Sequence, residues 1–236
     1  MKPRSSEPAL SIGFVTGTAP GKWFDRFGER TGHGEPVAGE SVDPMAELID
    51  GRVDLALVRL PDPRIDDTYH LVRLYEEEPG IAVPKDSELT LADTLGVDDI
   101  SDQTVFYRPD VDGSVDIRAV GEAVDIVATG VGAVLAPRPL LRRLGSRRTE
   151  NRGYRDGRPT TIALVWRVVD DCDMIQDFVG IARGRTEASS RTAQPKRSAS
   201  EKAAAKKARR TASGDASRRK PVGRGGAGAA RRRRRK

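Results

Sequence analysis

The stretch AELIDGRVDLALVRLPD, residues 46–62, places a short helix pattern directly before a strand pattern. Asp43-Pro44 precedes the helix and Gly51 follows it. Pro near a helix start and Gly just past its end are the usual residues at these two boundaries. Residues 53–60, VDLALVRL, form a mostly apolar run, which is typical of a buried strand. The stretch therefore predicts one helix–strand unit of an α/β protein.

The segments on either side repeat this alternation of strands and helices. Upstream, LSIGFVT (10–16) predicts a buried strand, and the turn TGTAPG leads into a helix over 19–29 with Pro20 in its first turn. Downstream, strands are predicted at 69–75, 80–84, 103–107, 132–137 and 160–168. Helices are predicted at 89–95, 122–129, 139–144 and 172–182. We therefore expect the α/β fold class, with at least partly parallel sheets.

Two polar stretches interrupt the pattern. The acidic run EEE at 76–78 is expected to be a solvated turn. Residues 145–159 are polar and rich in glycine, and we expect turns there, with YRDGRP as one of them.

Charge divides the 236-residue chain into two unlike parts. Residues 185–236 contain 19 Lys/Arg and 3 Asp/Glu, whereas residues 1–184 contain 22 Lys/Arg and 32 Asp/Glu. All eleven aromatic residues lie in residues 1–184. A segment so poor in apolar residues cannot offset the entropy lost on ordering. We therefore expect one acidic globular domain and a disordered basic tail over 185–236.

Composition excludes several classes of protein. No apolar run approaches the roughly 20 residues that cross a membrane, and the N-terminus lacks the apolar core of a secretory signal. A cytoplasmic protein with no membrane association is expected. Cys172 is the only cysteine, and His33 and His70 are far apart, so neither a disulfide nor a metal centre is expected.

The chain also lacks the motifs of common enzymes. GxSxG, GxxxxGK[ST] and HExxH are all missing. Cys172 is surrounded by three aspartates, and these would raise the pKa of its thiol and make it less reactive. We therefore expect no enzymatic activity and no cofactor.

Five segments, in the correct order, resemble the effector-binding domain of LysR-type transcriptional regulators, which has the type 2 periplasmic-binding-protein fold. These segments are LSIGFVTGTAP (10–20), AELIDGRVDLALVRLPD (46–62), YHLVRLYEEEPGIAVPKDSEL (69–89), DIVATGVGAVLAP (125–137) and TTIALVWR (160–167). The resemblance covers about residues 9–184. Because it begins so early, no helix-turn-helix module is expected in this chain.

The resemblance implies a two-lobed domain with a cleft, preceded by a flexible N-terminus over 1–8. Lobe one would comprise 9–82 and 158–184, and lobe two 83–157. The stretch between Phe106 and Ala123 is shorter than in the family, so the second lobe is expected to be trimmed. A homodimer is expected from the resemblance alone.

The positions that match the family's cleft are the candidate effector-binding residues. They are Thr16, Gly17, Thr18, Arg59, Tyr107, Arg108, Thr129 and Gly130. Glycines before a helix start expose backbone N–H groups, threonines donate hydrogen bonds, and arginine forms paired hydrogen bonds with a carboxylate. A small organic-anion effector is therefore expected. The alternative is that TGTAPG is an ordinary turn and that the arginines pair with nearby acids.

The tail resembles the carboxyl-terminal tails of linker histones and of actinobacterial histone-like proteins. A flexible cationic segment neutralises phosphates without reading sequence, so non-specific DNA binding and association with the nucleoid are expected. The candidate nucleic-acid-binding residues are Lys206, Lys207, Arg209, Arg210, Arg218, Arg219, Lys220, Arg231, Arg232, Arg233, Arg234, Arg235 and Lys236.

The functional prediction is a non-enzymatic protein related to LysR-type regulators, with a small-molecule effector domain and a DNA-binding tail. One alternative is a small-molecule or protein-interaction module whose tail only localises it or docks on its own acidic domain. Another is an enzyme built on the same scaffold, although the sequence offers no catalytic set.

Overall fold

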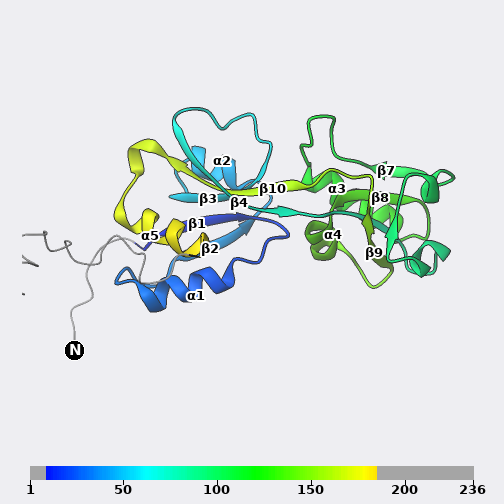
Figure 1. Ribbon diagram of the computed structural model, residues 1–236, viewed down its shortest axis with the longest axis horizontal. Helices are drawn as coiled ribbons and strands as arrows, with labels where there is room; N and C mark the ends of the chain where they lie inside the picture. Colours follow the sequence, from blue (N-terminus) through cyan, green and yellow to red (C-terminus); the bar gives the residue numbers. More distant parts are fainter. Residues whose placement is uncertain (1–8, 185–236) are drawn as a thin grey trace, which may run out of the picture. The chain divides into compact units, whose positions relative to one another are not determined.

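Two five-stranded mixed sheets form the framework of the protein in a computed structural model, which describes residues 9–184 (Figure 1). The described residues belong to one compact unit. Helices pack against both sheets, so the predicted two-lobed α/β fold is confirmed. We call the first sheet with its helices lobe one, and the second sheet with its helices lobe two.

The sheet of lobe one has the strand order β2-β1-β3-β10-β4. Its strands are β1 (Ser11–Val15), β2 (Val37–Ser41), β3 (Leu55–Leu60), β4 (Tyr69–Glu77) and β10 (Thr160–Arg167). Strands β2, β1 and β3 are parallel, and β10 is antiparallel to β3 and β4. The helices of this lobe are α1 (Gly21–Arg30), α2 (Pro44–Ile49) and α5 (Asp173–Ala182), and a 3-10 turn, η3 (Val168–Asp170), precedes α5.

The sheet of lobe two has the strand order β6-β9-β5-β8-β7. Its strands are β5 (Pro79–Pro84), β6 (Thr94–Leu95), β7 (Val105–Tyr107), β8 (Ala133–Pro137) and β9 (Thr149–Tyr154). The helices are α3 (Ile117–Val127) and α4 (Arg138–Leu144), with the 3-10 turns η1 (Glu88–Leu91) and η2 (Asp98–Ile100). The sheet has its full five strands, although β6 and β7 contain only two and three residues.

Strands β4 and β10 connect the two lobes. Only Glu78 separates β4 from β5, and residues 155–159 join β9 to β10. The two strands pair along their whole length, with Thr160 opposite Glu77 at the end nearest lobe two (Figure 1). Any change in the relation of the two lobes must therefore involve this antiparallel pair.

Alternating side chains explain how the lobe-one sheet is buried on both faces. In β3, Leu55 and Leu57 belong to the large core that also contains Phe27 and Phe178, whereas Ala56 and Val58 belong to a smaller core under α2. All four of these β3 residues are at most 2% exposed. The apolar run VDLALVRL thus forms a strand covered on both faces.

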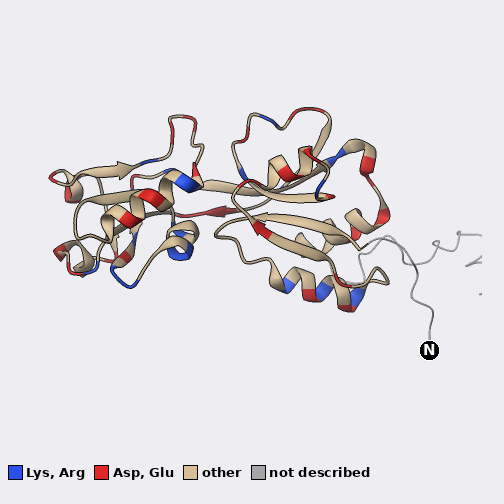
Figure 2. Cartoon of the chain, turned by 180° about the vertical axis from the view of Figure 1, so that it is seen from behind, with Lys and Arg blue, Asp and Glu red and all other residues tan. Residues whose placement is uncertain are grey.

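Helix α1 shows the amphipathic pattern expected from its sequence. Phe27 is fully buried, and its ring lies 5.6 Å from that of Phe178 on α5. The charged residues of α1 are exposed. Figure 2 shows acidic residues on helices and loops of both lobes. Within residues 9–184, no helix is long and apolar enough to cross a membrane.

Several local expectations are wrong. The acidic run at 76–78 is not a solvated turn, because β4 continues through Glu77, which is 2% exposed. The helix predicted at 122–129 already begins at Ile117, with Asp116 as its N-cap. Residues 145–159 include strand β9, and the helix expected at 89–95 is only the 3-10 turn η1 followed by β6.

Candidate functional site

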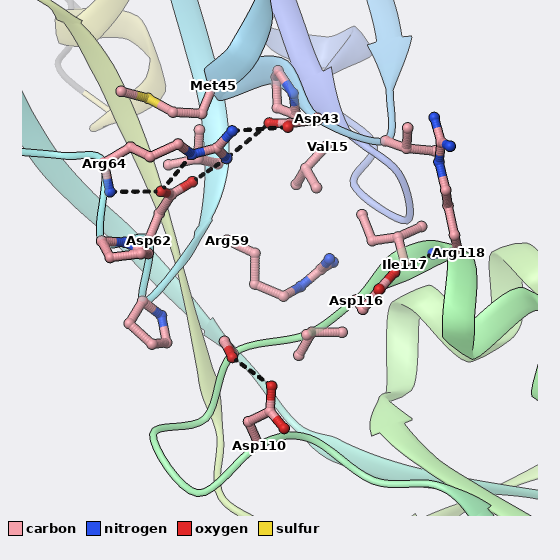
Figure 3. Close-up of a pocket in the computed structure, with 17 residues that line it drawn as sticks. Val15, Asp43, Met45, Arg59, Asp62, Arg64, Asp110, Asp116, Ile117 and Arg118 are labelled. Carbon is pink, nitrogen blue, oxygen red and sulfur yellow. Dashed lines mark hydrogen bonds and ion pairs between the residues drawn. The ribbon is translucent and has the colours of Figure 1, made fainter.

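A cavity of about 500 Å³ lies between segments of the two lobes (Figure 3). Lobe one supplies Val15 at the end of β1, residues 42–45 at the start of α2, and residues from 58–64 at the end of β3. Lobe two supplies residues from 110–118, which lead into α3. Pockets of this volume are typical of small-molecule sites.

Arg59 on β3 forms the buried base of the cavity. Its Nε donates to Glu77 Oε2 at 2.7 Å, and its Nη2 donates to Glu77 Oε1 and to the Thr16 carbonyl, both at 3.2 Å. Its Nη1 is buried and has no hydrogen-bond partner within residues 9–184. Buried donors are nearly always paired in proteins. This N–H group is therefore available to an acceptor on a bound molecule.

Glu77 connects the base of the cavity to the strands that join the lobes. It is the last residue of β4, and its Oε2 also accepts from Thr160 Oγ1 on β10 at 3.1 Å. The Arg59 and Glu77 side chains are only 5% and 1% exposed. We call Arg59, Glu77 and Thr160 the clamp, because their bonds hold β3, β4 and β10 together.

Arg64 organises the lobe-one rim of the cavity. Its two Nη atoms donate to the two carboxylate oxygens of Asp43 at 2.8 Å, and it also pairs with Asp62. Asp43 in turn caps α2 by accepting from Ala46 N at 3.0 Å. Hydrogen bonding to Arg64 holds the pKa of Asp43 below its ordinary value. The positive charge of Arg64 is thus already paired with these two carboxylates.

The lobe-two rim has two aspartates without an ion-pair partner in the described part of the chain. Asp116 caps α3, with Oδ1 accepting from the backbone N–H groups of Arg118 and Ala119 at 2.9 and 3.1 Å. Asp110 Oδ2 accepts from Ser114 Oγ at 3.1 Å. Arg118 is exposed and also forms no ion pair with another described residue.

Tyr107 lies beside these charged groups. Its hydroxyl accepts from Asp116 N at 2.8 Å. Burial raises the pKa of Tyr107, as do the charges of Asp110 and Asp116, whereas Arg59 and the hydrogen bond from Asp116 N lower it. The pKa of the Tyr107 hydroxyl is therefore affected by charges at the cavity base and on the lobe-two rim.

Of the predicted site residues, Arg59 lines the cavity, and Thr16 and Tyr107 adjoin it. The Thr16 hydroxyl is turned to the Ser41 carbonyl at 3.2 Å, and that of Thr18 to the Val15 carbonyl at 2.8 Å. Gly17 has φ of 95° and packs on α4, where an added Cβ would lie 2.8 Å from Leu140 Cα.

The other predicted residues lie elsewhere. Arg108 is exposed and outside the lining of the cavity. Thr129 and Gly130 line a different hollow, together with Lys85, Arg147 and Arg148. The structure therefore places three of the eight positions, Thr16, Arg59 and Tyr107, at or beside the cavity. Effector binding at all eight positions stays a prediction. The predicted DNA-binding residues lie outside the described residues.

The residues predicted from the sequence do not include Glu77, Asp110 or Asp116. Asp116 carried a usable signal, because Asp directly before the helical pattern IRAVGEAV is a common N-cap. Glu77 and Asp110 carried none, since their roles depend on strand pairing and on the path of a loop.

No cluster of potential metal ligands occurs within residues 9–184. The two histidines have structural partners: His33 Nε2 lies 3.1 Å from Asp177 Oδ2, and the His70 ring packs on Trp166. Cys172 is exposed and free.

Known structures share this arrangement of sheets. The BenM effector-binding domain with its effector benzoate superposes with a TM-score of 0.59 and 17% identity, over 76% of this chain and 92% of that domain. The OxyR regulatory domain from Pseudomonas aeruginosa gives 0.55 and 15%, over 75% and 95%. The fold is that of a LysR-type effector-binding domain. No protein-family model and no curated protein matches the chain.

The chain spans less than two thirds of some longer LysR-type relatives. OxyR from Corynebacterium glutamicum matches with a TM-score of 0.55 and 18% identity, over 75% of this chain but 64% of that one. The similarity therefore concerns the effector-binding fold and not the whole regulator.

Proposed function

We propose that the cavity binds a small organic molecule through an acidic group that accepts a hydrogen bond from Arg59 Nη1. The observation that carries this proposal is the buried Nη1 without a partner in residues 9–184. Charge-assisted hydrogen bonds between arginine and a carboxylate are among the stronger polar contacts in proteins. The solved BenM domain, whose effector is benzoate, supports a carboxylate ligand.

A ligand in this cavity contacts both lobes at once. Its acidic group meets Arg59, whose Glu77 partner ends β4 beside Thr160 of β10. Its remaining surface meets residues 110–118 of lobe two. Binding favours the relation of the lobes that best encloses the ligand, which is how an effector shifts a conformational equilibrium. We therefore propose a non-enzymatic, regulatory role in the cytoplasm.

The test is a thermal-shift and calorimetric screen of the full chain against small carboxylic acids, amino acids included. Arg59→Lys removes Nη1 and is expected to weaken binding at least about tenfold, which is about 1.4 kcal/mol. Val42→Trp narrows the cavity from a half-exposed position and leaves the clamp intact. Val42→Trp is expected to abolish binding. Arg52→Lys, on an exposed side chain outside the cavity, is the control.

Two results would contradict this proposal. One is the lack of any acid that stabilises the parent protein. The other is equal affinity in the parent, Arg59→Lys and Val42→Trp.

We further propose that the basic segment 185–236 binds DNA without sequence preference. Its support is composition alone: 19 basic and 3 acidic residues. If about ten charges engage phosphates, log K falls with log salt with a slope near about −9. The full chain should bind two unrelated duplexes equally, and a 1–184 truncation should not bind. Failure of the full chain to bind at low salt would favour docking of the tail on the acidic domain.

A further inference from the structure

The charges that face the cavity do not suit a simple anion. Its lining contains seven charged side chains, namely Asp43, Asp62, Asp110, Asp116, Arg59, Arg64 and Arg118. Arg64 is shared by Asp43 and Asp62, and Arg59 is paired with Glu77 behind it. Two rim carboxylates thus remain without an ion-pair partner among the described residues, opposed by one exposed arginine.

These two carboxylates also keep free acceptor atoms. Both capping bonds of Asp116 fall on Oδ1, and the bond from Ser114 to Asp110 falls on Oδ2. The other oxygen of each group accepts no hydrogen bond from residues 9–184. In Figure 3, the guanidinium of Arg59 extends toward the segment that carries Asp116, and Asp110 lies on the same lobe-two side.

A ligand with only an acidic group would bring a third negative charge into a cavity whose lining includes Asp110 and Asp116. Like charges repel one another, so these two exposed carboxylates disfavour a ligand whose only charge is negative. A ligand that also carries an ammonium group would instead pair with these carboxylates. Its acidic end would still reach the unpaired Nη1 of Arg59.

We propose that the ligand of the cavity is an amino acid or a related amino-substituted acid. Its carboxylate accepts from Arg59 Nη1, and its ammonium group donates to the free oxygens of Asp116 and Asp110. Its apolar part packs on Val58 and Ile117. The cavity, at about 500 Å³, has room for a molecule of this size. This inference rests on the proposed function, because it needs the same Arg59 anchor.

The experiment compares matched sets of three compounds by calorimetry on the full chain. One set is phenylalanine, 3-phenylpropionate and 2-phenylethylamine, and another is leucine, 4-methylpentanoate and isopentylamine. Within the set that binds, the amino acid is expected to bind at least about tenfold more tightly than either relative.

Two single-charge variants then locate the ammonium site. Asp110→Asn is expected to weaken the binding of the amino acid at least about tenfold. The affinity for the plain acid should stay equal or increase. Asp125→Asn removes the same charge from an exposed position of α3 outside the cavity, and no change is expected. Asp116 is left intact in this test because it caps α3.

The failures of the two proposals are distinct. If plain acids bind as tightly as amino acids and Asp110→Asn changes neither, the zwitterionic ligand is wrong while the acid anchor stands. If no compound with a carboxylate binds, or the amine binds as tightly as the amino acid, the anchor at Arg59 fails and this inference fails with it.

Discussion

The two ion-pair groups of lobe one beside the cavity differ in their exposure to water. Arg59 and Glu77 of the clamp are 5% and 1% exposed, whereas Arg64 and Asp43 of the rim are 40% and 45% exposed. Removing one partner of a buried ion pair strongly destabilises the folded state, because it leaves an unpaired buried charge. Exposed ion pairs contribute little to the free energy of unfolding. We infer that the buried clamp fixes the position of Arg59 in the binding site. The exposed ion pair of the rim contributes less to the stability of the fold.

Loss of the clamp carboxylate is expected to have the largest effect on stability. Glu77→Gln leaves a buried guanidinium without its counter-charge, which costs about 3–5 kcal/mol. Denaturant unfolding measures this loss. Glu76→Gln, the same change at the exposed neighbouring position, is the control and should be nearly neutral. Equal stability of the two variants would contradict a stabilising role for the buried Arg59–Glu77 pair.

Loss of the rim arginine is expected to have a smaller, salt-sensitive effect. Arg64→Ala removes the ion pair with Asp43, which is 45% exposed, and the ion pair with Asp62, which is 11% exposed. The exposed pair is worth about 0–1 kcal/mol at low salt. The cost of Arg64→Ala in denaturant unfolding should shrink at about 1 M salt, because the Debye length falls to about 3 Å. The cost of Glu77→Gln should be nearly unchanged by salt. A salt-independent cost for Arg64→Ala would contradict the distinction between rim and clamp.

The smallest expected effect is a pH dependence of the rim. Hydrogen bonding to Arg64 holds the folded-state pKa of Asp43 below 3.8. A lowered pKa gives stability that is present above the unfolded-state value and is lost as the pH falls through the folded-state value. Asp43→Asn should therefore lower Tm slightly near neutral pH, and the difference from the parent should disappear as the pH falls below 3.8 and through the lowered folded-state pKa. A gap that widens in acid would contradict this assignment.

The sequence predicted the lobe-one strands better than those of lobe two. Buried runs such as LALVRL in β3 and TTIALVWR in β10 are strongly apolar, because both faces of their sheet are covered. Strand β9, TENRGY, carries one buried residue and five half-buried ones, so its composition resembles that of a loop. Strand β2, VAGES, is an exposed edge strand and was missed for the same reason.

The candidate site was only partly predictable. Arg59 lies in a motif that the resemblance singled out, and it forms the base of the cavity. Glu77 was read as part of a solvated run, because its pairing with Arg59 across 18 residues exists only once β3, β10 and β4 are aligned. Thr129 and Gly130 were assigned to the cleft by resemblance, but they line a separate hollow.

The most direct test of the central claim is a crystal structure of the protein with the compound that binds most tightly in the screens. We expect a carboxylate oxygen of this compound to lie within hydrogen-bond distance of Arg59 Nη1, with the Arg59–Glu77 pair intact. A compound bound outside the cavity, or one whose acidic group contacts only the rim while Nη1 bonds to another protein atom, would contradict it.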